Sequence, residues 1–144
     1  MKKILFVDDD RFFAAAYVEA LRDKFEVRCV YDVETALEAL RADDSLSAAI
    51  VDVMMPSPNG FEAETHDGMT TGLWIIHEAR EEIEKRNLPI IVFSNRGREF
   101  VKGELAHLGL PPGLVTVSSK MAVPPFELAR FVESAIARSL VRKS

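Results

Sequence analysis

Short apolar runs alternate along the chain with segments in which apolar residues recur every three or four positions. The runs are Ile4–Val7, Ala48–Val51, Ile90–Phe93 and Leu114–Val117, with a more mixed run at Glu26–Tyr31. An apolar run without a polar break is typical of a strand that is covered on both faces, as in a parallel sheet. Arg28 interrupts the mixed run, which therefore suits a sheet edge.

The segments between the runs predict amphipathic helices, because their apolar residues share one face at helical spacing. The expected faces are Phe13, Tyr17, Ala20 and Leu21; Val33, Ala36, Leu37 and Leu40; Leu73, Ile76, Ala79 and Ile83; Val101, Leu105 and Leu108; and Leu128, Phe131, Val132, Ala135, Ile136 and Leu140. Asp32 is placed to cap the second helix, and Gly109 is placed to end the fourth.

Strand and helix therefore alternate five times, which predicts an α/β fold with a doubly wound parallel sheet. Five such units fill residues 1–144 as a single domain, with one long connection at about residues 54–71. This connection, MMPSPNGFEAETHDGMTT, has neither a helical nor a strand period. Connections of this length are usually functional or mobile.

Composition narrows the class of protein. Lys and Arg number 18 against 23 Asp and Glu, so the net charge of −5 argues against nucleic acid as a direct partner. The single Cys29 excludes a disulfide framework and any zinc site built from several cysteines. The apolar run after Met1 ends at three aspartates, and no stretch approaches the roughly 18 apolar residues of a membrane helix. We therefore expect a cytoplasmic protein without membrane insertion.

Polar residues follow the predicted strands, at the sheet edge where ligands bind in this fold class. They are Asp8, Asp9 and Asp10; Asp52; Ser94 and Asn95; and Ser118, Ser119 and Lys120. Carboxylates from Asp8, Asp9 and Asp52 at close range would either hold protons or bind a cation, and hard oxygen ligands suit Mg²⁺. With the Ser94 hydroxyl and the Lys120 amine, these are the groups needed for phosphoryl transfer to or from a carboxylate. Asp10 is better placed to cap the first helix.

The segments ILFVDDD (4–10), AAIVDVMMP (48–56), PIIVFSN (89–95), TVSSK (116–120) and PFEL (125–128) occur in an order that resembles CheY-like receiver domains of response regulators. The resemblance covers essentially the whole chain and implies the strand order 2-1-3-4-5. It implies that Asp52 is the phosphoacceptor, that Ser94 and Lys120 bind the phosphoryl group, and that Asp8, Asp9, Asp52 and the backbone carbonyl of Met54 form a Mg²⁺ site.

The resemblance also implies a function in two-component signalling. A sensor histidine kinase or phosphotransfer protein would offer a phosphohistidine, and the phosphorylated domain would signal through contacts with a downstream protein. The only reactions expected are self-phosphorylation and self-dephosphorylation, so the chain would not be an enzyme with its own substrate. A homodimer is left open.

The chain departs from the family pattern at four places. Residues 121–124 separate Lys120 from Pro125, where the family has Pro directly after the lysine in a cis bond, and a cis Lys120-Met121 bond would cost about 2.5–4 kcal/mol. Val117 stands where the family often has an aromatic ring that rotates on activation. Asn95 replaces a small residue, and the connection after Pro56 is about a dozen residues longer than usual.

Two other classes of function stay open. A binding module with the receiver fold could signal without phosphate, and the altered lysine segment, Val117 and the long connection all favour it. A haloacid-dehalogenase-type phosphatase would use Asp8 and Asp10 together with Ser94 and Lys120. Such phosphatases also need an acidic pair at a later strand end, and the only acids after Lys120 are Glu127 and Glu133, both in the last helix. A flavin site is disfavoured because the first loop is triply acidic.

Outside this edge of the sheet, no residue set carries a strong prediction. His66 lies in the long connection near Glu62, Glu64 and Asp67, a set that is more simply solvated than metal-binding. His77 and His107 are expected at the surface, and Trp74 is expected to pack under the long connection.

Overall fold

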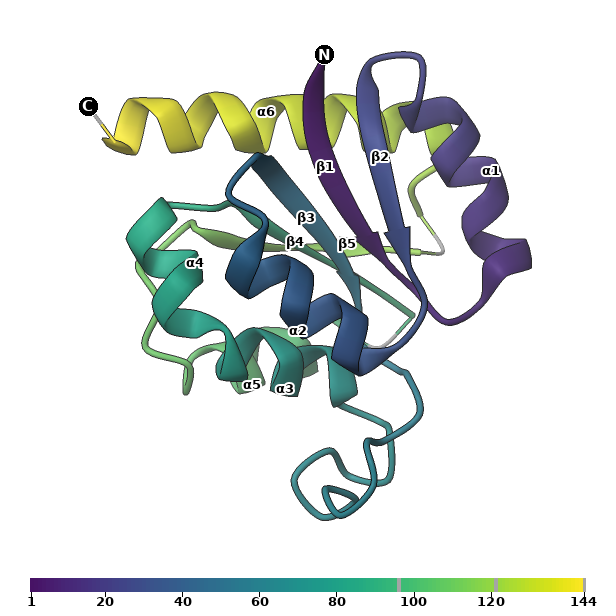
Figure 1. The fold of residues 1–144 in the computed structure, drawn as a ribbon, viewed down its shortest axis with the longest axis vertical. Coiled ribbons are helices and arrows are strands. Elements are labelled where there is room, and N and C mark those ends of the chain that lie inside the picture. The colour runs from purple at the N-terminus through teal and green to yellow at the C-terminus, as the bar shows by residue number, and fades with distance from the viewer. Residues whose placement is uncertain (96, 121, 144) are drawn as a thin grey trace.

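The protein is described by a computed structural model that covers residues 1–95, 97–120 and 122–143. Its parallel sheet has the strand order β2-β1-β3-β4-β5 (Figure 1). The strands are β1 (Lys2–Val7), β2 (Phe25–Val30), β3 (Leu46–Asp52), β4 (Ile90–Ser94) and β5 (Val115–Ser119). This topology confirms the predicted doubly wound α/β fold and its order.

Helices cover both faces of the sheet (Figure 1). α1 (Arg11–Leu21) and α6 (Pro125–Lys143) lie on one face, and α2 (Val33–Ala42), α3 (Thr71–Glu78), α4 (Arg80–Arg86) and α5 (Arg98–Leu105) lie on the other. Because side chains alternate along a strand, Phe6 and Ile50 pack toward α1 and α6, while Leu5 and Val51 pack toward α2 to α5. All four are essentially inaccessible to solvent, so the predicted two-sided burial of these strands is confirmed.

The helix predictions hold in outline and differ in three details. The predicted third helix is two helices, α3 and α4, which meet at Ala79. α5 ends at Leu105, and single turns carry the chain on toward Gly109, which has φ of 71°. Leu140 was expected in the core but is 55% exposed, because the last turns of α6 run past the sheet (Figure 1).

The expected cap of the second helix is present. Asp32 caps α2, since its side chain accepts a hydrogen bond from the backbone N–H of Thr35 at 2.8 Å. None of the helices in the described ranges combines the length and apolar character needed to cross a bilayer.

The long connection at 54–71 is organised as successive turns. Thr65 is completely buried, and its hydroxyl donates to the carbonyl of Phe61 at 2.9 Å and pairs with the hydroxyl of Ser57 at 2.7 Å. The backbone N–H of Met55 donates to the carbonyl of Gly68 at 3.2 Å, which closes the loop. The segment therefore lacks a regular helix or strand, as its pattern predicts, yet internal hydrogen bonds hold it in one shape.

Asp43 ties together the edge of the sheet opposite the polar strand ends. Its carboxylate is 2.9 Å from Lys3 on β1 and 3.1 Å from Arg28 on β2, and it also accepts from the backbone N–H of Ser45 at 3.1 Å. The Ser45 hydrogen bonds and then the Lys3 contact hold the pKa of Asp43 well below its usual range. The Asp43 side chain is only 12% exposed, so its contacts are partly shielded from screening by salt.

We expect Asp43→Asn to lower the free energy of unfolding by about 1–3 kcal/mol at neutral pH, since a charged hydrogen-bonding group is lost. A depressed folded-state pKa contributes stability that is present above the unfolded value and is lost as the pH falls through the folded value. The difference in the free energy of unfolding between variant and wild type should therefore shrink below about pH 4. Urea denaturation at neutral pH and at pH values below about 4 measures this difference.

Asp44→Asn is the matched control, because the neighbouring Asp44 is exposed and the charge change is the same. A loss of stability at Asp44 equal to that at Asp43 would contradict the role assigned to the Lys3 and Arg28 contacts.

Candidate functional site

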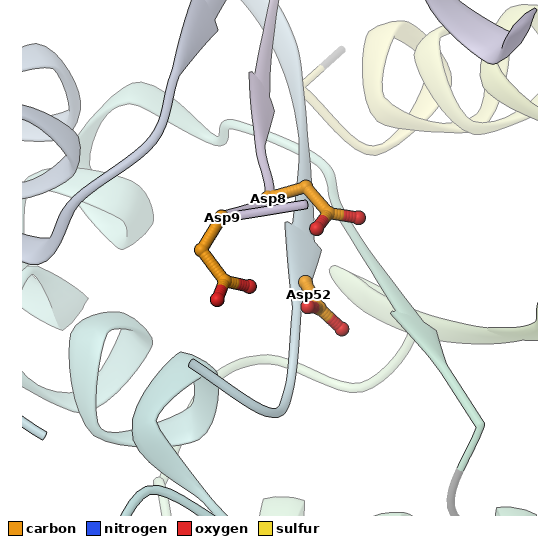
Figure 2. A group of neighbouring side chains, drawn as sticks. All are labelled: Asp8, Asp9 and Asp52. Atoms are coloured by element: carbon orange, nitrogen blue, oxygen red, sulfur yellow. The ribbon is translucent and has the colours of Figure 1, made fainter. Parts of the chain in front are cut away.

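Three carboxylates meet at the carboxyl edge of the sheet (Figure 2). Asp8 and Asp9 follow β1, and Asp52 is the last residue of the neighbouring β3. Because Val7 is paired with Val51, Asp8 and Asp52 leave the sheet side by side. One oxygen from each of the three side chains lies within 4.8 Å of the others. Asp8 and Asp52 are buried, and Asp9 is exposed.

Local hydrogen bonds set the path of the chain after β1. The Asp8 carboxylate accepts from the backbone N–H of Asp10 at 2.9 Å, which turns the chain into α1. Asp10 in turn accepts from the backbone N–H of Phe13 at 3.0 Å, as a helix cap does. The cap assigned to Asp10 is confirmed. The phosphatase alternative needs Asp10 in the site, so this geometry disfavours that alternative.

Lys120 reaches the acidic cluster from β5. Its Nζ atom lies 3.0 Å from Asp8 Oδ2 and 3.0 Å from Asp52 Oδ1, and its side chain is only 8% exposed. The same Nζ lies 4.5 Å from the centre of the Phe13 ring, a favourable cation–π distance. The backbone N–H of Lys120 donates to the carbonyl of Ser94 at 3.0 Å. β4 therefore fixes where this lysine leaves the sheet.

Burial and charge shift the pKa values of the site strongly. Burial, and then the charge of Asp8, raises the pKa of Asp52 to about 7 against the opposing effect of Lys120. Burial and Asp8 also raise the pKa of Asp9. Burial works to lower the pKa of Lys120, but Asp52 and Asp8 outweigh it, and the net shift is upward. Three carboxylates face one ammonium, so the site has room for further positive charge.

The remaining expected site residues lie around this cluster. Ser94 is 1% exposed and follows Phe93, the residue paired with Asp52 across β3 and β4. Met54 lies on the turn two residues beyond Asp52. Asn95 is exposed, and Val117 is buried in the core beneath α2 to α5. The Lys120-Met121 bond lies outside the described residues.

Gly72 is a structural requirement that the sequence analysis did not single out. A Cβ atom there would lie 1.9 Å from the carbonyl oxygen of Asp52, and the Gly72 N–H donates to the carbonyl of Val53 at 2.8 Å. The start of α3 is thus pressed against the backbone that carries Asp52. Only the fold brings these segments together, because a glycine at the end of a long connection resembles any other turn residue.

Tyr17 is a second such residue. Its hydroxyl donates to the carbonyl of Val123 at 2.7 Å, within the segment that departs from the family pattern after Lys120. Its ring packs edge-on against Phe93 at 5.0 Å between centroids and stacks on Phe13. The helical pattern identifies Tyr17 as a core residue but gives no signal of this hydroxyl contact.

Comparisons with known proteins place the fold in a class. No family model matches the chain. The transcriptional regulatory protein CpxR of Escherichia coli K12 is 44% identical over 63 residues, which cover 43% of this chain and 26% of CpxR. CpxR of Klebsiella pneumoniae is 34% identical over 100 residues, covering 69% of this chain and 36% of that protein. The chain thus matches only about a third or less of the length of these relatives.

Solved structures resemble the chain over nearly its full length. The CheY-like receiver domain protein of Methanospirillum hungatei JF-1 superposes with a TM-score of 0.75 at 16% identity, covering 99% of this chain and 98% of that one. A response regulator receiver protein of Sinorhizobium medicae WSM419 superposes with a TM-score of 0.70 at 22% sequence identity, covering 95% of both chains.

The fold is therefore the doubly wound sheet of CheY-like proteins, with an acidic cluster and a lysine at its carboxyl edge. With the sequence similarity to CpxR, these features identify the chain as a receiver domain of the response-regulator kind.

Gly72→Ala tests the close packing behind Asp52. The added methyl group must displace the Asp52 carbonyl, so we expect a loss of about 1–3 kcal/mol in the free energy of unfolding. Gly103→Ala, in α5 with no atom within 4 Å of its Cβ position, should gain about 0.5–1 kcal/mol instead. Thermal or urea denaturation of both variants measures the contrast, and equal stability of the two would contradict it.

The raised pKa of Asp52 predicts an unusual pH dependence of stability when no divalent cation is present. The folded chain retains a proton on Asp52 up to about pH 7, whereas the unfolded chain releases it near pH 4. Stability should therefore fall as the pH rises between these two values. Asp52→Asn should remove this part of the slope, which urea denaturation in a chelating buffer would measure.

Added Mg²⁺ should restore stability to the wild type at the upper end of that range, because a bound cation favours the ionised carboxylates. A wild type whose slope equals that of Asp52→Asn would show that Asp52 ionises normally.

Proposed function

We propose that this receiver domain accepts a phosphoryl group on Asp52 from a phosphohistidine of a partner protein. The observation that carries the proposal is the buried Asp52 carboxylate 3.0 Å from Lys120 Nζ, with Asp8 and Asp9 beside it. A carboxylate held between a cation and further acidic ligands is suited to phosphoryl transfer. The negative charge of the incoming phosphoryl group must be neutralised as that group approaches the carboxylate.

In the proposed reaction, an Asp52 oxygen attacks phosphorus and forms an acyl phosphate. The bond between phosphorus and the histidine nitrogen breaks, and the imidazole leaves as the neutral ring after taking up a proton. Asp52 must be ionised to attack. Burial and Asp8 oppose that state, whereas Lys120 favours it. Lys120 would also stay within reach of the transferred oxygens, because its backbone N–H is hydrogen-bonded to the carbonyl of Ser94 at the end of β4.

The donor set fits Mg²⁺, which prefers carboxylate and carbonyl oxygens and keeps several waters. Asp9 and Asp52 would bind it directly, Asp8 largely through water, and the backbone carbonyl of Met54 would complete the protein ligands. When bound, Mg²⁺ would supply charge neutralisation at the phosphoryl oxygens. Ser94, buried at the end of β4, would donate its hydroxyl to one of those oxygens.

The partners follow from this chemistry. A sensor histidine kinase or a phosphotransfer protein would supply the phosphoryl group in the cytoplasm, and a downstream protein would respond to the phosphorylated face. The role is that of a signalling switch, without turnover of a separate substrate. The receiver domain proteins similar in structure are consistent with this role.

A receiver-like module that works without phosphate is the second candidate. Val117 favours it, because this buried position has no ring that could move with Ser94. The two candidates differ in whether the acidic cluster reacts at all, and a small phosphodonor decides between them.

The test is labelling by acetyl phosphate with and without Mg²⁺. We expect Mg²⁺-dependent incorporation of one phosphoryl group in the wild type, and none in Asp52→Asn. Asp10→Asn is the matched control, because it removes an adjacent acid whose contact is to the cap of α1, and it should label normally. Intact-mass spectrometry measures the added group.

Lys120→Met should label about 10²-fold more slowly, since one positive group facing the transferred oxygens is lost. Undiminished labelling of Asp52→Asn would exclude Asp52 as the acceptor, and absence of labelling in the wild type would favour the phosphate-independent module.

A further inference from the structure

A groove of about 550 Å³ opens where the long connection faces α3 and the end of α5. Its apolar surface comes from Phe61 and Trp74, whose ring centroids are 4.9 Å apart, together with Leu73 and Leu108. Phe61 is 42% exposed, so part of its ring is open to solvent at the groove. The connection that forms one wall is the same segment that projects beyond α3 in Figure 1.

The charged residues that line the groove are all acidic. Glu64 comes from the connection, Glu78 from α3 and Glu104 from α5, and no lysine or arginine is among the described residues that line it. The remaining polar lining includes all three histidines of the chain, His66, His77 and His107. The groove therefore holds three carboxylates beside the aromatic rings of Phe61 and Trp74.

The walls of the groove are held in place before any partner binds. The connection is organised around buried Thr65, as described above. At its end the Thr71 hydroxyl donates to the carbonyl of Met55 at 2.7 Å, which joins the connection to the start of α3. A preformed surface loses little conformational entropy on binding, so modest contacts can give measurable affinity.

A metal ion is a poor occupant despite the three histidines. Within the described residues, the one group of three His, Cys, Asp or Glu ligand atoms close enough to hold an ion is Asp8, Asp9 and Asp52. His77 Nδ1 instead lies 3.2 Å from its neighbour Glu78. Histidines that share a groove without converging on one point do not form a coordination site.

We propose that this groove is a docking site for a basic peptide segment of a partner protein, one with lysine or arginine flanking large apolar side chains. Three carboxylates from three elements complement the basic residues, and the Phe61 and Trp74 rings accept the apolar ones and stack with guanidinium groups. The site needs no phosphoryl group, so it goes beyond the function proposed for Asp52.

The test uses two synthetic peptides on the full chain, one of alternating lysine and leucine pairs and one with glutamate in place of every lysine. Trp74 is the only tryptophan, so its fluorescence reports directly on the groove. We expect saturable binding of the lysine peptide alone, weakened by added salt. Asp52→Asn should bind it equally well, which separates this proposal from the phosphoacceptor function.

The combined variant Glu64→Gln, Glu78→Gln and Glu104→Gln should bind the lysine peptide at least tenfold more weakly. The control makes the same change in net charge at Glu19, Glu84 and Glu127, which are exposed and lie outside the groove, and it should retain wild-type affinity. Phe61→Ser should also weaken binding, with its folding checked by circular dichroism.

Equal weakening by the control variant would mean that net charge alone attracts the peptide, and the proposal would be wrong. Binding of the glutamate peptide, or a Trp74 response to Zn²⁺ alone without any response to the lysine peptide, would also overturn it.

Discussion

The contacts of one buried lysine with two buried carboxylates organise the functional end of this molecule. Lys120 lies 3.0 Å from both Asp8 and Asp52, on three different strands or strand ends. Removing such charges from water is costly unless each is paired. The sheet order β2-β1-β3-β4-β5 makes this pairing available, because it brings the ends of β1 and β3 together and β5 within reach. One ammonium group does not balance the three carboxylates Asp8, Asp9 and Asp52, so binding of a cation there is favoured.

The same edge of the sheet links the reactive site to the feature that distinguishes this chain. Gly72 packs against the Asp52 carbonyl, and Thr71 beside it holds Met55, so the long connection and the acceptor strand share one set of backbone contacts. The acidic groove on the connection is therefore built onto the segment that leaves the site. Direct contacts through the start of α3 thus join the acceptor strand to one wall of the groove.

Much of the fold and the main site residues could be predicted from local pattern. Unbroken apolar runs such as Ile90–Phe93 predict buried strands, and polar residues directly after them predict where chemistry gathers, because parallel strands end at one edge. The pattern predicts less well where packing against other elements determines burial or the end of a helix. Leu140 continues an apolar stripe yet lies beyond the sheet, and a continuous stripe hides the change from α3 to α4 at Ala79.

The sequence by itself determined the alternation of strands and helices, the acids at the ends of β1 and β3, and the lysine after β5, because periodicity and strand ends are local properties. Only the tertiary structure decided the contacts between distant segments. These include the exclusion of a side chain at Gly72, the Tyr17 bond to Val123, and the gathering of His66, His77 and His107 along one groove. Each of these contacts depends on which elements pack against one another in the folded chain. Proximity between residues far apart in the sequence leaves no periodic signal in the chain.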